Sequence, residues 1–204
     1  MIPKTLFVAA VAAALAGCAS IMYTPPTEQE TMAVIKSSFK DRGIAKVDRL
    51  NQSELQRACT ETANDPPKDV RERLEKAALA TVKYPADGKW LGDYKQGERI
   101  AQTGVGMQWS DQAGAPAGGN CYACHQLSKA EISYGNIGPS LNGYGKLRGY
   151  SEDIRKYTWA KIWNTHSFNA CSSMPRFGDA GILTEDQIRH LMALLLDPNS
   201  PVNQ

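Results

Sequence analysis

The chain has 204 residues, which suits one domain with an extension or at most two small domains. Its 23 Lys and Arg balance 21 Asp and Glu, so net charge gives no indication of binding to nucleic acid or to a membrane surface. Apolar residues make up 42% of the sequence, as in ordinary folded proteins, and only the N-terminal run is strongly apolar.

The N-terminus has the pattern of an export signal. A weakly basic start with Lys4 precedes an apolar run, Leu6–Ala16, that is too short to span a bilayer of about 30 Å as a helix. The run ends in Leu15-Ala-Gly-Cys18, which is typical of a lipoprotein signal peptide, residues 1–17, cleaved before a lipidated Cys18. Ordinary cleavage at the small residues nearby, with Cys18 incidental, is the alternative. The mature protein is expected in the periplasm, free or tethered by a lipid anchor.

Residues 18–88 are predicted to form a mostly helical N-terminal extension without a chemical motif of its own. A first helix is expected from Glu28 to Phe39. Pro66-Pro67 opens a stronger helical stretch from Lys68 to Lys83, in which apolar residues recur at helical spacing. Tyr84-Pro-Ala-Asp-Gly88 ends this stretch, because Pro and Gly interrupt helices.

Residues 89–204 are predicted to form a compact helical domain, so the expected fold class is all-α. Helices are expected over three segments: Asp93–Gln102, Glu152–Asn164 and Thr184–Leu196. The last begins with Thr184 and Gln187 at capping-box spacing, carries apolar residues along one face, and ends before Pro198. Gly97 would let the first of these helices approach the last one closely.

The strongest chemical signal is Cys121-Tyr-Ala-Cys124-His125, a C-x-x-C-H motif typical of covalent haem c attachment. If the motif starts a helix, both thiols and the imidazole lie on one face, where the thiols reach the haem vinyl groups and His125 reaches the iron. Half of a zinc site and a dithiol redox pair are the competing interpretations. Zinc would need a second ligand pair at matching spacing, and a dithiol oxidoreductase a β-α-β pattern; we find neither.

A sixth iron ligand is expected from Met174, within Ser173-Met-Pro-Arg-Phe-Gly178. Pro175 favours an extended backbone at Met174, which suits a loop across the far face of the haem. A thioether ligand favours ferrous iron, so ligation by His and Met implies a relatively high reduction potential. His166 is the rival ligand, although a helix end favours capping or surface exposure, and His190 is interpreted as structural.

Gly138-Pro139 follows the haem motif and is predicted to support His125. Pro139 contributes a carbonyl and no N–H. Such a carbonyl can accept a hydrogen bond from Nδ1 of the proximal His, which fixes the tautomer and tunes the iron.

The five cysteines divide by expected use. Haem attachment takes two of them, and lipidation takes Cys18. Cys59 and Cys171 remain, and an oxidising compartment would allow them to form a disulfide. Two separate buried thiols are the alternative, because a free Cys is often buried.

Between about residues 90 and 200 the sequence resembles class I c-type cytochromes, through Gly97, the haem motif, Gly138-Pro139, the Met174 loop and the terminal helix. Six strings together resemble SoxX, the family of monohaem subunits of the bacterial sulfur-oxidising cytochrome SoxXA: Gly92-Asp-Tyr-Lys95, Tyr134-Gly-Asn-Ile-Gly-Pro-Ser-Leu141, Tyr157-Thr-Trp159, Lys161-Ile-Trp-Asn164, Ser173-Met-Pro-Arg-Phe-Gly178 and Gly181-Ile-Leu-Thr-Glu185. The extension matches less distinctly, and the lipoprotein signal departs from the plain export signal expected of that family.

The resemblance implies a class I cytochrome c fold around one covalent haem c. It further implies a heterodimer with a SoxA subunit, acting as L-cysteine S-thiosulfotransferase, which oxidatively couples thiosulfate to a cysteine of the SoxYZ carrier. This chain would accept electrons from the SoxA side and pass them to a small cytochrome c, without turnover of its own. Two alternatives stay open: a stand-alone periplasmic electron-transfer cytochrome c, and a sensor in which Cys171 or His166 replaces Met174.

Overall fold

The structure is a computed structural model that describes residues 24–204. The residues up to Lys40 and the segment Asp41–Gln204 form two separate units. The described residues contain helices and no strand, and one isolated bridge pairs Arg42 with Ala45. The predicted all-α class therefore holds for this part of the chain.

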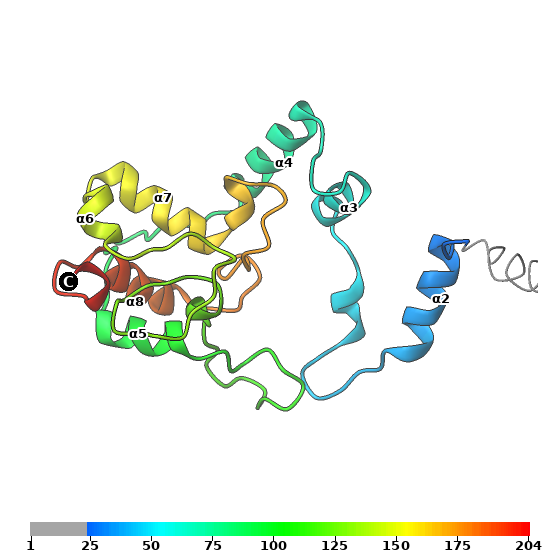
Figure 1. Cartoon of the computed structure of the whole chain (residues 1–204), viewed down its shortest axis with the longest axis horizontal. Helices are drawn as coiled ribbons and strands as arrows, with labels where there is room; N and C mark the ends of the chain where they lie inside the picture. The colour runs from blue at the N-terminus through cyan, green and yellow to red at the C-terminus, as the bar shows by residue number, and fades with distance from the viewer. Residues whose placement is uncertain (1–23) are drawn as a thin grey trace, which may run out of the picture. The chain divides into compact units, whose positions relative to one another are not determined.

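The first unit contains helix α2, Glu28–Ser38 (Figure 1). Its start is fixed by a reciprocal cap, in which the Thr27 hydroxyl accepts the Glu30 N–H and the Glu30 carboxylate accepts the Thr27 N–H. This capping box explains why the helix begins where the sequence predicted.

The second unit begins with the 3-10 helix η1, Val47–Leu50, and the helices α3, Glu54–Glu61, and α4, Lys68–Ala80. α3 was not predicted, because only Cys59 of this short polar helix is buried. α4 ends earlier than the predicted Lys83. The Thr81 N–H bonds to Ala78 three residues back, so the last turn tightens and the helix stops.

The remaining elements follow in chain order: α5 (Tyr94–Gln102), η2 (Cys121–Ala123), α6 (Tyr144–Arg148), α7 (Glu152–Trp163), η3 (Thr165–Ser167), α8 (Glu185–Leu196) and η4 (Pro201–Asn203). The predicted capping box of Thr184 and Gln187 is present at the start of α8. α6 was not predicted, because it is only five residues long and lies between Gly143 and Gly149.

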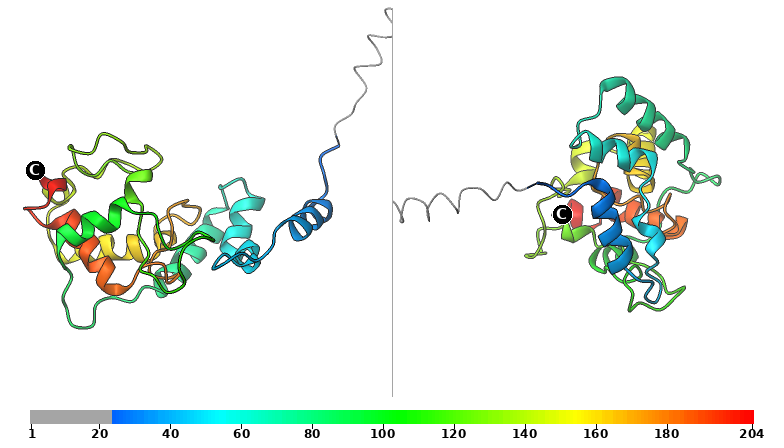
Figure 2. Two further views of the ribbon diagram at one scale, coloured as in Figure 1. Left: turned by 90° about the horizontal axis from the view of Figure 1, so that it is seen from below. Right: turned by 90° about the vertical axis from the view of Figure 1, so that its right-hand side faces the viewer.

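Helices α5 and α8 pack against each other and lie side by side in Figure 1 and in the left view of Figure 2. The contact depends on Gly97, because a Cβ there would collide with the His190 carbonyl of α8. The predicted close approach at Gly97 is confirmed. His190 has the structural role expected of it, since its Nδ1 accepts the Asp93 N–H at 2.8 Å.

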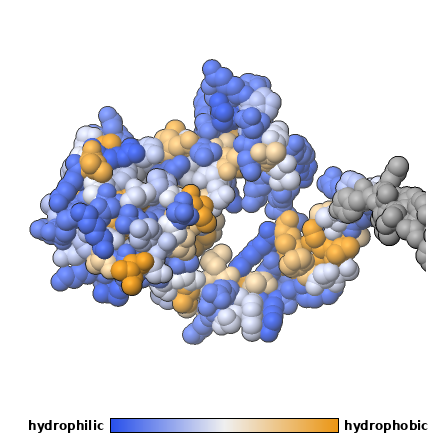
Figure 3. Space-filling model, viewed as in Figure 1, coloured by the Kyte–Doolittle hydropathy of each residue, from blue (hydrophilic) through white to orange (hydrophobic). Residues whose placement is uncertain are grey.

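One hydrophobic cluster, formed mainly by α7 and α8, makes up the core of the second unit. Trp159 of α7 and Met192 of α8 are fully buried in it. On the face of this unit shown in Figure 3, hydrophilic residues cover most of the surface and apolar residues form separate small spots. The core positions the loops between the helices.

Candidate haem site

The Cys121–His125 turn is positioned by backbone hydrogen bonds to the end of α5. Gly119 donates to the Ile100 carbonyl at 2.8 Å, and Asn120 donates to the Thr103 carbonyl at 2.9 Å. Asn120 adopts a left-handed conformation with φ 45°, which turns the chain into η2. The motif is therefore attached directly to the helix that packs on α8.

The motif makes one tight turn and does not start a longer helix. The N–H groups of Cys124 and His125 both donate to the Cys121 carbonyl, at 3.1 and 2.9 Å. Three carbonyls accept hydrogen bonds from the following loop instead of from a helix: Tyr122 from Gly135, Cys124 from Gly138, and Gln126 from Leu141, each at 2.8 Å. These loop N–H groups take the place of the donors that a continuing helix would have supplied to the same carbonyls.

The imidazole of His125 is held from two sides. Its Nδ1 lies 2.7 Å from the Pro139 carbonyl, and a carbonyl can only accept, so Nδ1 carries the proton. A Cβ on Gly138 would collide with the ring, so glycine is what allows the backbone to lie against it. The contact expected between Pro139 and His125 is present, and it leaves Nε2 with a free lone pair.

Cys121 and Cys124 are half-buried free thiols. Burial raises the pKa of the Cys121 thiol to about 12, which is opposite to the lowered pKa that an attacking thiol of a redox pair requires. Within residues 24–204, no three His, Cys, Asp or Glu side chains converge in a way that could hold a metal ion. The dithiol interpretation is thus disfavoured, and the ligand group of a structural zinc site is not found in this range.

Met174 lies in the loop between η3 and α8. Its side chain is half-buried and packs against the same hydrophobic cluster as Cys121. Its N–H donates to the Ser172 hydroxyl at 3.2 Å. Each predicted iron ligand is thus held by its own loop: the His125 side chain by the Pro139 carbonyl, and the Met174 backbone by the Ser172 hydroxyl.

His166, the rival ligand, is buried, and the expectation of a capping or surface position was wrong. The chain turns inward after α7, and all three residues of η3 are buried. The Nε2 of His166 lies 3.2 Å from the Ser172 carbonyl, to which it donates. Burial also lowers the pKa of His166, so the neutral ring is favoured. In this position His166 supports the Met174 loop.

Cys59 and Cys171 form a disulfide, with their Cα atoms 5.6 Å apart. The expected pairing is therefore present in the structure, and the alternative of two separate thiols is not. Cys59 belongs to α3, whereas Cys171 lies three residues before Met174. The bond connects the N-terminal extension to the Met174 loop.

Trp163 of α7 is a buried residue to which the sequence analysis assigned no role. Its indole N–H has no hydrogen-bond partner among the described residues. The ring packs against the loop of Met174 at Gly178, where a Cβ would collide with it. A buried donor without a partner costs about 1–3 kcal/mol, so an acceptor from outside the chain would stabilise it. In the sequence, Trp163 stood out only as a member of Lys161-Ile-Trp-Asn164, one of the six strings that resemble SoxX.

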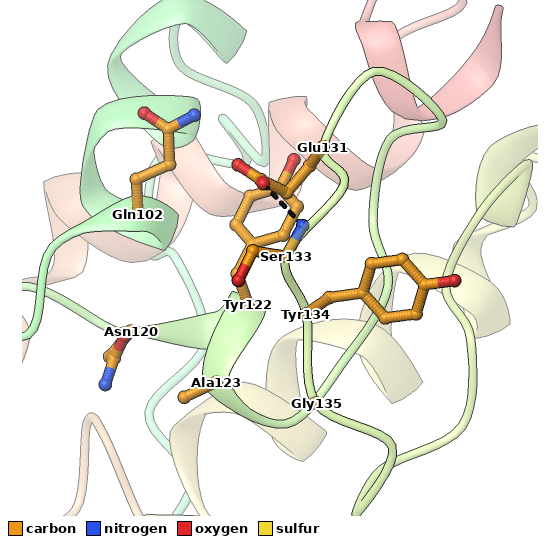
Figure 4. A pocket seen from close by; sticks show the side chains of 8 residues that line it. All are labelled: Gln102, Asn120, Tyr122, Ala123, Glu131, Ser133, Tyr134 and Gly135. Atoms are coloured by element: carbon orange, nitrogen blue, oxygen red, sulfur yellow. Dashed lines mark hydrogen bonds between the residues drawn. The ribbon is translucent and has the colours of Figure 1, made fainter.

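A depression of about 530 Å³ lies beside the Cys121–His125 turn (Figure 4). Its lining residues are mostly polar: Gln102, Asn120, Tyr122, Ala123, Glu131, Ser133, Tyr134 and Gly135. Within it, the Ser133 N–H donates to the Glu131 carboxylate at 2.8 Å. Neither the two thiols nor His125 belongs to the lining, so the depression is separate from the residues predicted to bind haem.

No protein-family model matches the sequence. Over 210 aligned residues it is 33% identical to an uncharacterized lipoprotein of Aquifex aeolicus (strain VF5), and the alignment covers 98% of each chain. The chain belongs to the family of this lipoprotein.

The membership in this lipoprotein family agrees with the signal pattern Leu15–Cys18. Cys18 itself lies outside the described residues. None of the helices within residues 24–204 has the length and apolar character needed to cross a membrane.

Proposed function

We propose that the chain binds one haem c covalently through Cys121 and Cys124, with His125 and Met174 as iron ligands. The observation that carries the proposal is the 2.7 Å contact between His125 Nδ1 and the Pro139 carbonyl. It leaves Nε2 free in the same turn as two unpaired thiols, whereas Cys59 and Cys171 are joined to each other. A bound haem would supply an iron that takes up and returns one electron.

The described residues fit such a group in further respects. The buried N–H of Trp163 lacks an acceptor, and the carboxylates of a haem are acceptors. Met174 and Cys121 pack against one hydrophobic cluster, which suits an apolar ring system.

The arrangement of elements supports a class I cytochrome c fold. The first helix of the predicted domain, α5, crosses the terminal helix α8 at Gly97. The C-x-x-C-H turn follows α5, and the Met174 loop precedes α8. This order is the one that the sequence resemblance implies.

We infer that the chain is the electron-transfer subunit of a SoxXA-type enzyme in the periplasm, paired with a SoxA subunit. The complex would couple thiosulfate to a cysteine of the SoxYZ carrier, and this subunit would pass electrons to a small cytochrome c. Six matching strings between Gly92 and Glu185 support this inference. Because His125 and Met174 would both be held as ligands of the iron, the subunit would transfer electrons and bind no substrate there.

A membrane-tethered, stand-alone electron-transfer cytochrome is the second candidate. The observation in its favour is the lipoprotein character of the relative together with the lipobox-like Leu15–Cys18. A lipid on Cys18 would hold the protein at the periplasmic face of a membrane.

Haem attachment is tested by expressing the full chain in the periplasm of a host with cytochrome c maturation. The intact mass of the mature protein is then measured by mass spectrometry. We expect the mass of one haem, and its complete loss in Cys121→Ala/Cys124→Ala. The matched control Cys59→Ala/Cys171→Ala also lacks two cysteines and should keep the haem. A wild-type protein without covalent haem would sink the proposal.

The partner is tested by pull-down of the tagged protein from its native periplasm, followed by an assay with thiosulfate and the carrier. Recovery of a second haem subunit, with electron release only when both subunits are present, is expected of the SoxXA-type enzyme. Rapid electron exchange without a partner and without thiosulfate dependence would assign the stand-alone cytochrome instead.

A further inference from the structure

The loop that carries Met174 is fixed on its C-terminal side by the helical core. Phe177 is buried in the hydrophobic cluster. The N–H groups of Gly178 and Asp179 both donate to the Trp163 carbonyl at the end of α7, at 3.1 and 3.0 Å. This side of the loop is anchored by residues of the predicted cytochrome domain alone.

The N-terminal side of the same loop is fixed by α3 and α4 of the extension. Cys171 is joined to Cys59 of α3 across a sequence separation of 112 residues. The N–H of the fully buried Ala170 donates to the Glu75 carboxylate of α4 at 3.1 Å, across 95 residues. Two consecutive loop residues are thus tied to two helices outside the predicted cytochrome domain.

Ser172 connects these ties to Met174. Its hydroxyl accepts hydrogen bonds from the Met174 N–H at 3.2 Å and from the Thr165 hydroxyl at 3.1 Å. Its carbonyl accepts the hydrogen bond from His166. Because Ser172 directly follows Cys171, a displacement of the disulfide-bonded residue is passed on to the backbone of Met174.

We propose that α3 and α4 form a clamp that positions the Met174 thioether at the iron, with Cys59, Cys171 and Glu75 as positioning residues. The inference rests on the proposed function, because it requires a bound haem. A movement of its loop would take Met174 off the iron, and the disulfide restricts that movement at residue 171. Without the clamp the loop keeps its C-terminal anchors and the hydrogen bonds of Thr165 and His166 to Ser172, and the open state becomes more populated.

The test measures how tightly imidazole binds to the ferric haem of the full-length holoprotein. Imidazole needs the position that Met174 occupies, so its apparent affinity follows the fraction of molecules with an open loop. For Cys59→Ser/Cys171→Ser we expect imidazole to bind about tenfold or more tightly than to the wild type. The weak red absorption band of Met-ligated ferric haem should decrease in parallel.

A second pair of variants tests the clamp with the disulfide intact. Glu75→Ala removes the acceptor for the Ala170 N–H, whereas Glu75→Gln keeps an oxygen in its place. We expect a smaller rise in imidazole affinity for Glu75→Ala and wild-type affinity for Glu75→Gln. A merely structural role of the carboxylate would not produce this difference at the iron.

Val202→Ala controls for a general loss of stability, because Val202 is fully buried in η4, which packs on α6 and α8. It should lower the melting temperature without raising imidazole affinity. Unchanged affinity in the disulfide and Glu75 variants, or an equal rise in Val202→Ala, would overturn the clamp while leaving haem attachment intact. If Met174→Ala binds imidazole no more tightly than the wild type, Met ligation itself is wrong.

Discussion

The two segments proposed to face the haem are held in different ways. The Cys121–Leu141 segment is held largely by its own hydrogen bonds, including those of Gly138 to Cys124 and of His125 to Pro139. The Ala170–Gly178 segment is held at one end by the core and at the other by bonds that span 95 and 112 residues.

This difference has a consequence for how the position of each proposed iron ligand can be changed. The position of His125 is set by neighbouring residues, so only substitutions close to the motif should disturb it. The position of Met174 also depends on α3 and α4, far away in the sequence. If the chain binds haem as proposed, the extension could alter ligation by Met174, and with it the reduction potential, without any change in the Cys121–His125 motif.

Of the substitutions that test this comparison, Gly138→Ala is expected to have the largest effect. It disturbs the Cys121–Leu141 segment next to His125. The added Cβ would occupy the space of the His125 ring. We expect the free energy of unfolding of the holoprotein to fall by about 1–3 kcal/mol, as in other overpacked sites. The ring should also lose its contact with Pro139, visible as a shifted or absent Nδ1–H signal of His125 by NMR.

Gly114→Ala is the matched control, because a Cβ at Gly114 meets nothing within 4 Å and only its positive φ opposes the substitution. It should lower stability modestly and leave the Nδ1–H signal in place. If Gly138→Ala also leaves this signal and the stability unchanged, the local support of His125 is wrong.

The same difference in range explains what the sequence could predict. Helices with local start signals were found close to their true positions, as for α8 with Thr184 and Gln187 and for α5 after the cap residue Asp93. The Pro139 contact of His125 also follows from residues close in sequence. Such features depend on neighbours along the chain, which a sequence displays directly.

Features that depend on distant contacts were missed or left open. α3 is polar and is held at Cys59, so its packing does not show in its own pattern. The burial of His166 depends on the packing of η3 against the Met174 loop, where its ring bonds to the Ser172 carbonyl. Nothing in the sequence singles out Glu75, since its partner Ala170 lies 95 residues away.

The smallest effect is expected from a substitution of Trp163, which lies where α7 packs against the Ala170–Gly178 segment. Trp163→Phe removes an indole N–H that has no partner among the described residues. If a haem carboxylate accepts this N–H, the holoprotein should lose about 0.5–1.5 kcal/mol of unfolding free energy, measured in urea. Trp159→Phe serves as the reference, because the Trp159 indole donates to the Lys83 carbonyl at 2.8 Å. Its loss of unfolding free energy shows how much the removal of a satisfied indole hydrogen bond costs. An unchanged or higher stability of Trp163→Phe would mean that a bound haem supplies no acceptor for this N–H.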